Sequence, residues 1–228
     1  MVMVGRKHNY GKELFRPTAD NRREYNEEDE KTALRVIRYA LEYYLGWGPE
    51  DAKARLSFPI LRSLKLDGLV KNRIKFPPEL NRTQEIGYLV SKLYPKEYPY
   101  QEKAAIEAYY SGVLNHQVER FRNGFFTGTG GAKRAAICLR YMLKVAFPFR
   151  DVDQIYECFA SEEGRALLRK YGLASAARDL YPYPIDFLHY SLPENMRSEK
   201  AYHKLRAQEE AKAMQKRAAA RKADYRKI

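Results

Sequence analysis

The chain has 228 residues, of which 45% are apolar and 31% are charged, so it can bury one large core or two smaller ones. This composition excludes a disordered chain, and no apolar run approaches the roughly 20 residues that a membrane-spanning helix needs. A formal net charge of +13 favours a polyanionic partner, of which nucleic acid is the commonest.

The first part of the chain predicts an arm and then a helical unit. Residues 1–31 carry seven basic and seven acidic side chains, whose charges cancel, and we expect them to form an N-terminal arm. The first helical unit is predicted over 32–95. Its first helix has an apolar stripe at spacings of three and four residues, made by Leu34, Ile37, Leu41 and Leu45. Gly46 and Gly48 end this helix, and Pro49 begins the next, because proline suits the first turn of a helix.

The stretch 48–76 predicts two short helices joined by a turn and followed by a basic segment, the order found in helix-turn-helix modules. We expect Ser57 to cap the second helix and Gly68 to end it. The cations that would face nucleic acid are Arg62, Lys65, Lys71, Arg73 and Lys75. The alternative is an ordinary pair of packed helices whose basic face is solvated, because the spacing of the motif is loose.

Part of the first unit resembles a known domain. The segment "YYLGWGPEDAKARLSF…LKLDGL", followed by "YLVSKLYP", is similar to an uncharacterised domain of spore-forming Gram-positive bacteria and their mobile elements. The resemblance covers at most residues 1–100. It implies no activity, cofactor or site residue for this chain.

A second helical unit is predicted over 96–192, because the prolines of "YPKEYPY" interrupt the preceding helix. Two stretches, 32–80 and 134–188, resemble each other and predict an internal repeat, although amphipathic helices can match by chance. The matched residues, at a constant offset, are Ala33, Arg38, Tyr39 and Leu41 with Ala135, Arg140, Tyr141 and Leu143.

The repeat predicts a counterpart of the basic helix in the second unit. Gly68 pairs with Gly172 after a drift of two residues, and both would end a helix. The counterpart then carries three cations, Arg165, Arg169 and Lys170. The tyrosines of the match, Tyr39 and Tyr141, are expected to pack in the core.

The loop "FFTGTGGAKRAA", residues 125–136, lacks both nucleotide-binding patterns, the P-loop spacing and the third glycine of the dinucleotide fingerprint. It precedes a predicted helix, whose bare amides, flexible glycines and two cations suit a backbone phosphate. The residues predicted to contact nucleic acid here are Arg120, Arg122, Thr129, Gly130, Gly131, Lys133 and Arg134. Replacing Gly130 and Gly131 by Glu and Asp is then expected to stabilise the helix and weaken binding. The alternative is a plain connector between two helices.

The last segment, 193–228, predicts a long basic helix or a disordered basic tail. It is rich in strong helix formers and has almost no apolar stripe. Its predicted contacts with nucleic acid are Arg217, Arg221 and Lys222. Because little apolar area would be lost, we expect deletion of residues 198–228 to leave thermal unfolding nearly unchanged.

Together these features predict an all-α protein of two related helical units with a long basic C-terminal helix. We expect it to bind nucleic acid, double-stranded DNA rather than RNA, in a regulatory or architectural role without catalysis. An adaptor that docks an acidic protein on its tail helix is the alternative. A nuclease is a remote one, since it rests on a single pair, His116 and Glu119, expected on one helix. The scattered cysteines and histidines predict a reducing cytoplasm, no bound metal and no cofactor.

Overall fold

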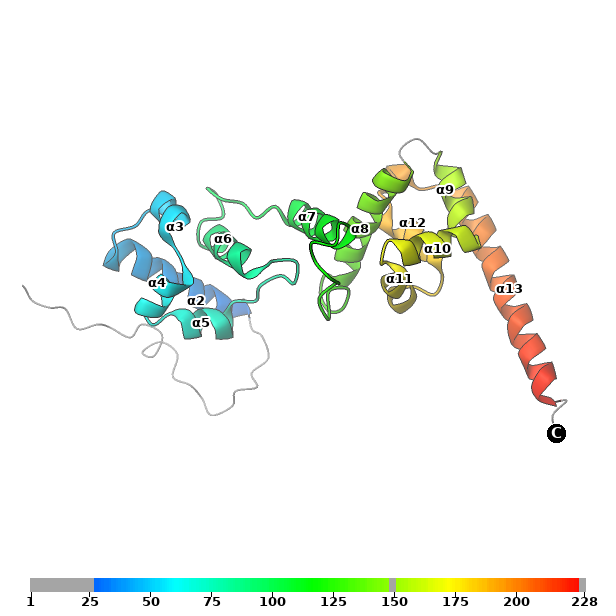
Figure 1. The fold of residues 1–228 in the computed structure, drawn as a ribbon, viewed down its shortest axis with the longest axis horizontal. Helices are drawn as coiled ribbons and strands as arrows, with labels where there is room; N and C mark the ends of the chain where they lie inside the picture. Colours follow the sequence, from blue (N-terminus) through cyan, green and yellow to red (C-terminus); the bar gives the residue numbers. More distant parts are fainter. Residues whose placement is uncertain (1–26, 148–150, 226–228) are drawn as a thin grey trace, which may run out of the picture. The chain divides into compact units, whose positions relative to one another are not determined.

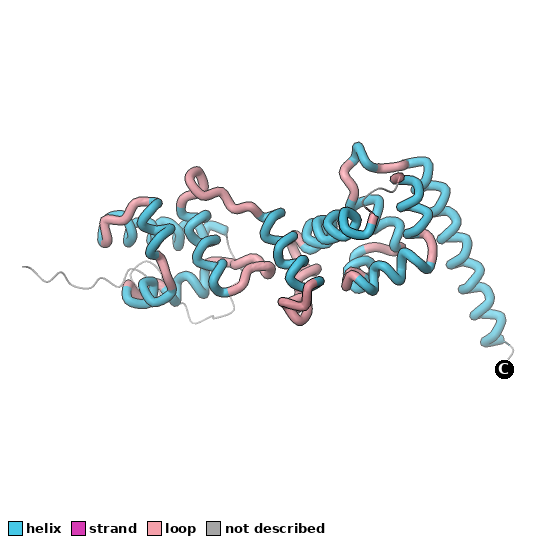
Figure 2. Tube along the Cα trace, turned by 45° about the horizontal axis from the view of Figure 1, so that its top comes forward, coloured by secondary structure: helices cyan, strands magenta, loops and turns pink. Residues whose placement is uncertain are grey.

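The computed structural model describes residues 27–147 and 151–225, and these residues form an all-α fold, as predicted (Figures 1 and 2). The described residues contain twelve α-helices and no strand. The chain divides into two compact units, Met1–Glu102 and Lys103–Ile228. This boundary follows residue 102, whereas the sequence-based boundary follows residue 95. Most of the predicted N-terminal arm lies outside the described residues.

Unit 1 is built around its first helix. Its described elements are α2 (Glu27–Tyr39), a π-helical turn (Ala40–Tyr44), α3 (Pro49–Arg55), α4 (Phe58–Ser63), α5 (Asp67–Arg73) and α6 (Arg82–Leu93). Helix α2 packs against α5 and α6, and α3 packs against α6. Local signals set the ends: Pro49 is the first residue of α3 and Asn81 caps α6. Asn81 Oδ1 accepts from Gln84 N at 3.0 Å, and Gln84 Oε1 accepts from Asn81 N at 2.9 Å.

Two sequence-based expectations for unit 1 are wrong. Helix α4 ends at Ser63, and Gly68 is the second residue of α5 rather than a stop. The chain reverses at Lys65, whose φ is 59°, because the buried side chain of Leu66 turns back into the core. Leu66 N donates to Leu61 O and Lys65 N donates to Arg62 O, the two hydrogen bonds of a Schellman turn. Tyr39 is 50% exposed, so it is not a core residue.

Unit 2 carries the longer helices. Its elements are α7 (Glu102–Leu114), α8 (Gly131–Ala146), α9 (Val152–Phe159), α10 (Glu162–Lys170), α11 (Ala174–Leu180), α12 (Pro184–Ser191), a 3₁₀ turn (Glu194–Met196) and α13 (Glu199–Tyr225). Helix α12 is central, since it packs against α8, α9, α11 and α13 (Figure 1). The largest fully buried side chains of this core are Tyr110, Phe125, Tyr156, Phe159 and Phe187.

Helices α8–α12 follow the order and the pairing of α2–α6. The pairs α2–α5, α2–α6, α3–α6 and α4–α5 in unit 1 recur in unit 2 as α8–α11, α8–α12, α9–α12 and α10–α11. The turn after α10 repeats the turn after α4: Leu173 N donates to Leu168 O and Gly172 N donates to Arg169 O. Gly172, with φ 69°, therefore matches Lys65 rather than Gly68, because positive φ falls at that place in both turns.

Helix α13 is partly a core element, which corrects the expectation for the tail. Tyr202 and Leu205 are more than nine-tenths buried, and the helix packs against α9 and α12. Tyr202 Oη donates to Asp186 Oδ1 at 3.0 Å, and Arg206 Nε donates to the same oxygen at 2.7 Å. Two apolar residues three positions apart suffice to dock the first turns, although they make no long stripe. Deletion of residues 198–228 would thus remove part of the core of unit 2.

Candidate nucleic-acid interface

The glycine-containing loop between α7 and α8 is folded onto a cluster of aromatic rings. Phe125 is fully buried, and its ring centroid lies 5.0 Å from that of Tyr109 and 4.9 Å from that of Phe126. Phe121 lies 4.7 Å from Phe126, and the hydroxyl of Tyr109 accepts from the backbone N–H of Arg122 at 3.0 Å. The loop is therefore held in one shape by its own apolar side chains.

Arg134, predicted to bind phosphate, is buried under this loop. Only 9% of it is exposed. Its Nε donates to the carbonyl oxygen of Phe125 at 2.6 Å, and a terminal nitrogen donates to that of Thr127 at 3.2 Å. The guanidinium carbon also lies 5.6 Å from the centre of the Phe125 ring. Within the described residues Arg134 thus closes the loop and is not available to an external phosphate.

The glycines of the loop meet local backbone requirements. Gly128 and Gly130 have φ of 65° and 86°, a backbone conformation that residues other than glycine rarely adopt. A Cβ on Gly131 would lie 2.3 Å from the carbonyl oxygen of Phe126. The expectation that Glu and Asp at 130 and 131 would stabilise the helix is therefore wrong, since both would strain the backbone. The loop has the geometry of a tight connector.

The remaining predicted residues of this region lie at the surface. Arg120, Arg122, Thr129 and Lys133 are exposed, while Gly131 is buried. His116 and Glu119 are exposed in the loop after α7 and do not share a helix, which removes the geometric basis of the nuclease alternative. No group of three His, Cys, Asp or Glu side chains in the described residues is placed to hold a metal ion.

The cations of unit 1 divide into an exposed set and a structural one. Arg62, Lys65 and Lys71 are exposed on the two sides of the α4–α5 turn. Arg73 instead pairs with Asp29 of α2 at 2.8 Å, and both side chains are at least three-quarters buried, so it ties α5 to α2. Lys75 is exposed just beyond α5. Ser57 occupies the capping position of α4 without a side-chain hydrogen bond.

The matching turn of unit 2 carries cations at two equivalent places. Aligning the two turns on Leu61 and Leu168 places Arg169 opposite Arg62 and Arg178 opposite Lys71. Arg169 and Arg178 are exposed, as are their counterparts. Sequence reasoning identified Arg169 but missed Arg178. The spacing of leucines, Leu61 to Leu66 and Leu168 to Leu173, would have found it.

The two arginines line a groove of about 520 Å³ at the surface of unit 2. Arg165, Tyr181 and Tyr183 also line it. Arg178 Nε donates to Asp179 at 2.8 Å, and Arg165 pairs with Glu162 at 2.7 Å. Arg169 makes no ion pair with any described residue. The groove thus combines aromatic walls with a cation that is open to an external anion.

The predicted contacts in the tail, Arg217, Arg221 and Lys222, lie on α13, but their side chains are outside the described part of the structure. No helix in the described part is long and apolar enough to cross a membrane. The chain matches no protein-family model, no curated protein and no solved structure. Its functional residues are therefore inferred from its own geometry.

Proposed function

We propose that the protein binds nucleic acid through two equivalent basic turns. The basic turn of unit 1 comprises Arg62, Lys65 and Lys71, and that of unit 2 comprises Arg169 and Arg178. One observation carries the proposal: the same backbone turn occurs in both units with exposed cations at the same two places. In a chain of net charge +13, a repeated pair of exposed cations fits a polymer with regularly spaced negative charges.

The short helices favour double-stranded DNA and contacts to its backbone. Helix α4 has six residues, which makes it about 9 Å long. The major groove of DNA admits a helix end, whereas that of double-stranded RNA is too narrow for side chains to read. Contacts of Arg and Lys side chains with phosphates hold a protein on DNA but do not read its sequence. We therefore propose an architectural or regulatory role with modest sequence preference and without catalysis.

The test compares variants that remove one pair of cations at a time. The double variants R62Q/K71Q and R169Q/R178Q are titrated with a labelled DNA duplex at several salt concentrations. Each should weaken binding about tenfold and make the salt slope shallower by up to about 1.8, since each lost phosphate contact contributes about 0.9. The control R35Q/K96Q removes two exposed charges of unit 1 outside the basic turns. An equal loss in the control, or no binding by the parent at low salt, would contradict the proposal.

An acidic protein partner is the second candidate. Helix α13 continues to Tyr225, well beyond Glu209, the last of its described side chains to be buried. The described side chains beyond Glu209 are exposed or half-buried, and the sequence there is rich in Lys and Arg. Truncation after residue 213 keeps the docked turns, so it tests the partner without unfolding unit 2. The adaptor role requires that this truncation abolish capture of an acidic polypeptide while DNA binding persists.

A further inference from the structure

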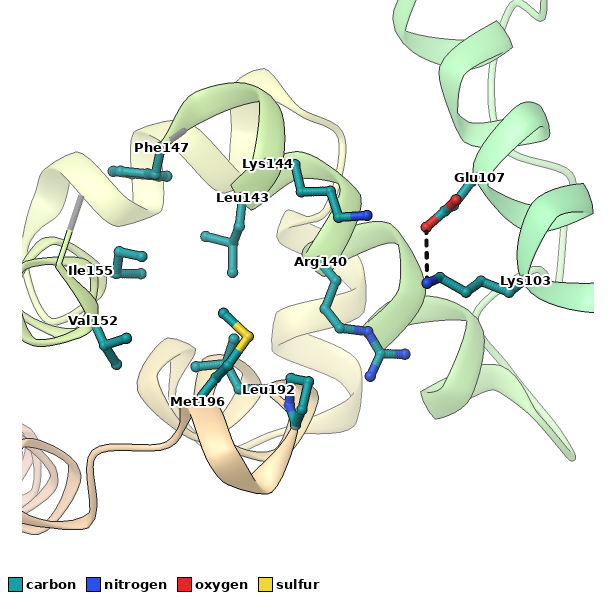
Figure 3. A pocket seen from close by; sticks show the side chains of 11 residues that line it. Lys103, Glu107, Arg140, Leu143, Lys144, Phe147, Val152, Ile155, Leu192 and Met196 are labelled. Atoms are coloured by element: carbon teal, nitrogen blue, oxygen red, sulfur yellow. Dashed lines mark ion pairs between the residues drawn. The ribbon is translucent and has the colours of Figure 1, made fainter. Parts of the chain in front are cut away.

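Unit 2 contains a second concave site, which shares no residue with the basic turns. It has a volume of about 490 Å³ and is formed by α7, α8, α9 and the segment that follows α12 (Figure 3). Its apolar part is lined by Leu143, Phe147, Val152, Ile155, Leu192 and Met196. The volume is typical of sites for small organic ligands, which are mostly apolar with a few converging polar groups.

The polar groups gather on one side of this apolar part. Figure 3 shows Arg140 and Lys144 extending from α8 on the side that faces Lys103 and Glu107 of α7. The only hydrogen bond of the Arg140 guanidinium within the described residues is a long one, 3.4 Å to the carbonyl oxygen of Ser191. Most of its N–H groups therefore have no acceptor among the described residues. Lys144 is exposed and makes no ion pair in the described part of the chain.

Glu107 adds an unusual feature to this side of the site. Its Oε1 atom is buried and accepts no hydrogen bond from the described residues, and Lys103 Nζ lies 4.0 Å away. The three cations and one carboxylate leave a surplus of positive charge. Lys103 pairs with Glu107, so their charges largely offset each other and the surplus lies at Arg140 and Lys144.

We propose that this site binds a small amphiphilic anion, an acyl chain that ends in a carboxylate. The chain would lie against Leu143, Ile155 and Met196, and the carboxylate would accept from Arg140 and Lys144. Nucleic acid does not fit, because the apolar side of the site offers no groups for sugar or phosphate. Lys103 stays beside Glu107, which repels the carboxylate and keeps it at the α8 side.

The proposal is tested with dodecanoate below its micelle concentration, measured by calorimetry and by displacement of an anionic fluorescent probe. Dodecanoate should bind saturably with one site per chain, and dodecylammonium and acetate should bind at least tenfold more weakly. R140Q should weaken dodecanoate binding about tenfold, because a charge-assisted hydrogen bond is lost. E107Q should strengthen it about threefold, because a like charge is removed.

The control is K133Q, an exposed cation of the same helix that does not line the site. It should leave dodecanoate affinity unchanged, and circular dichroism should show that all three variants keep their helical content. Equal affinity for dodecylammonium, or an equal loss in K133Q, would overturn the proposal. So would binding of an acidic helical peptide without binding of dodecanoate. Opposite effects of R140Q and E107Q distinguish a real charged site from general loss of stability.

Discussion

Replacing Arg134 with methionine separates a structural role of this residue from a phosphate-binding one. Methionine keeps much of the side-chain volume but removes the donors that serve the carbonyls of Phe125 and Thr127. An acceptor left without a donor costs about 1–3 kcal/mol when it is buried, and less when it is partly exposed. Since the first carbonyl is buried and the second is partly buried, we expect R134M to lower the free energy of unfolding by about 2–4 kcal/mol.

The measurement is urea unfolding followed by circular dichroism, together with DNA titration under conditions where the variant is fully folded. The matched control is K133M, the exposed neighbour on the same helix, which should change stability by less than about 0.5 kcal/mol. DNA affinity of folded R134M should stay within about twofold of the parent. The reasoning fails if R134M is as stable as the parent but binds DNA much more weakly, because Arg134 would then serve an external phosphate.

Two further predictions concern α13 and His189, a residue of α12 whose ring stacks on that of Tyr202 in α13. L205A should lower the free energy of unfolding by about 2–3 kcal/mol because Leu205 is buried, whereas M214A should change it by less than about 0.5 kcal/mol because Met214 is 69% exposed; urea unfolding measures both. Burial lowers the pKa of His189 below its ordinary value of 6.5. The unfolded state therefore binds a proton at a higher pH than the folded state does. Stability should therefore fall as the pH drops below 6.5, by at most about 1.4 kcal/mol per pH unit, and H189Q should remove this slope. A slope that persists in H189Q, or equal losses in L205A and M214A, would refute the respective argument.

The sequence predicted the helices better than it predicted the turns between them and their contacts with the core. Pro49 was identified as the start of a helix because proline acts within the first turn, so its effect depends only on neighbours along the chain. The turn at Lys65 was missed because a residue other than glycine adopts positive φ there. Its cost is offset by burial of Leu66, a contact with the core that no local pattern contains.

The predicted site residues also fall into two groups: exposed cations, which the sequence predicts, and structural arginines, which it does not distinguish from them. Net charge and the exposed cations of the α4–α5 turn follow from composition and helix periodicity. Arg73 and Arg134 are cations too, but their side chains already have partners. Arg73 pairs with Asp29, and Arg134 donates to loop carbonyls, so both have a structural role. A cation's availability depends on which acceptors fold over it, and only the three-dimensional contacts supply that information.

By itself, the sequence determined that this protein is helical and strongly basic, because helix propensity, capping and charge are properties of residues and their near neighbours. Only the tertiary structure decided that the glycine loop is closed by Arg134 and that α13 begins inside the core. Each of these depends on packing between segments that are separate along the chain, which sets burial and hydrogen bonding independently of local preference.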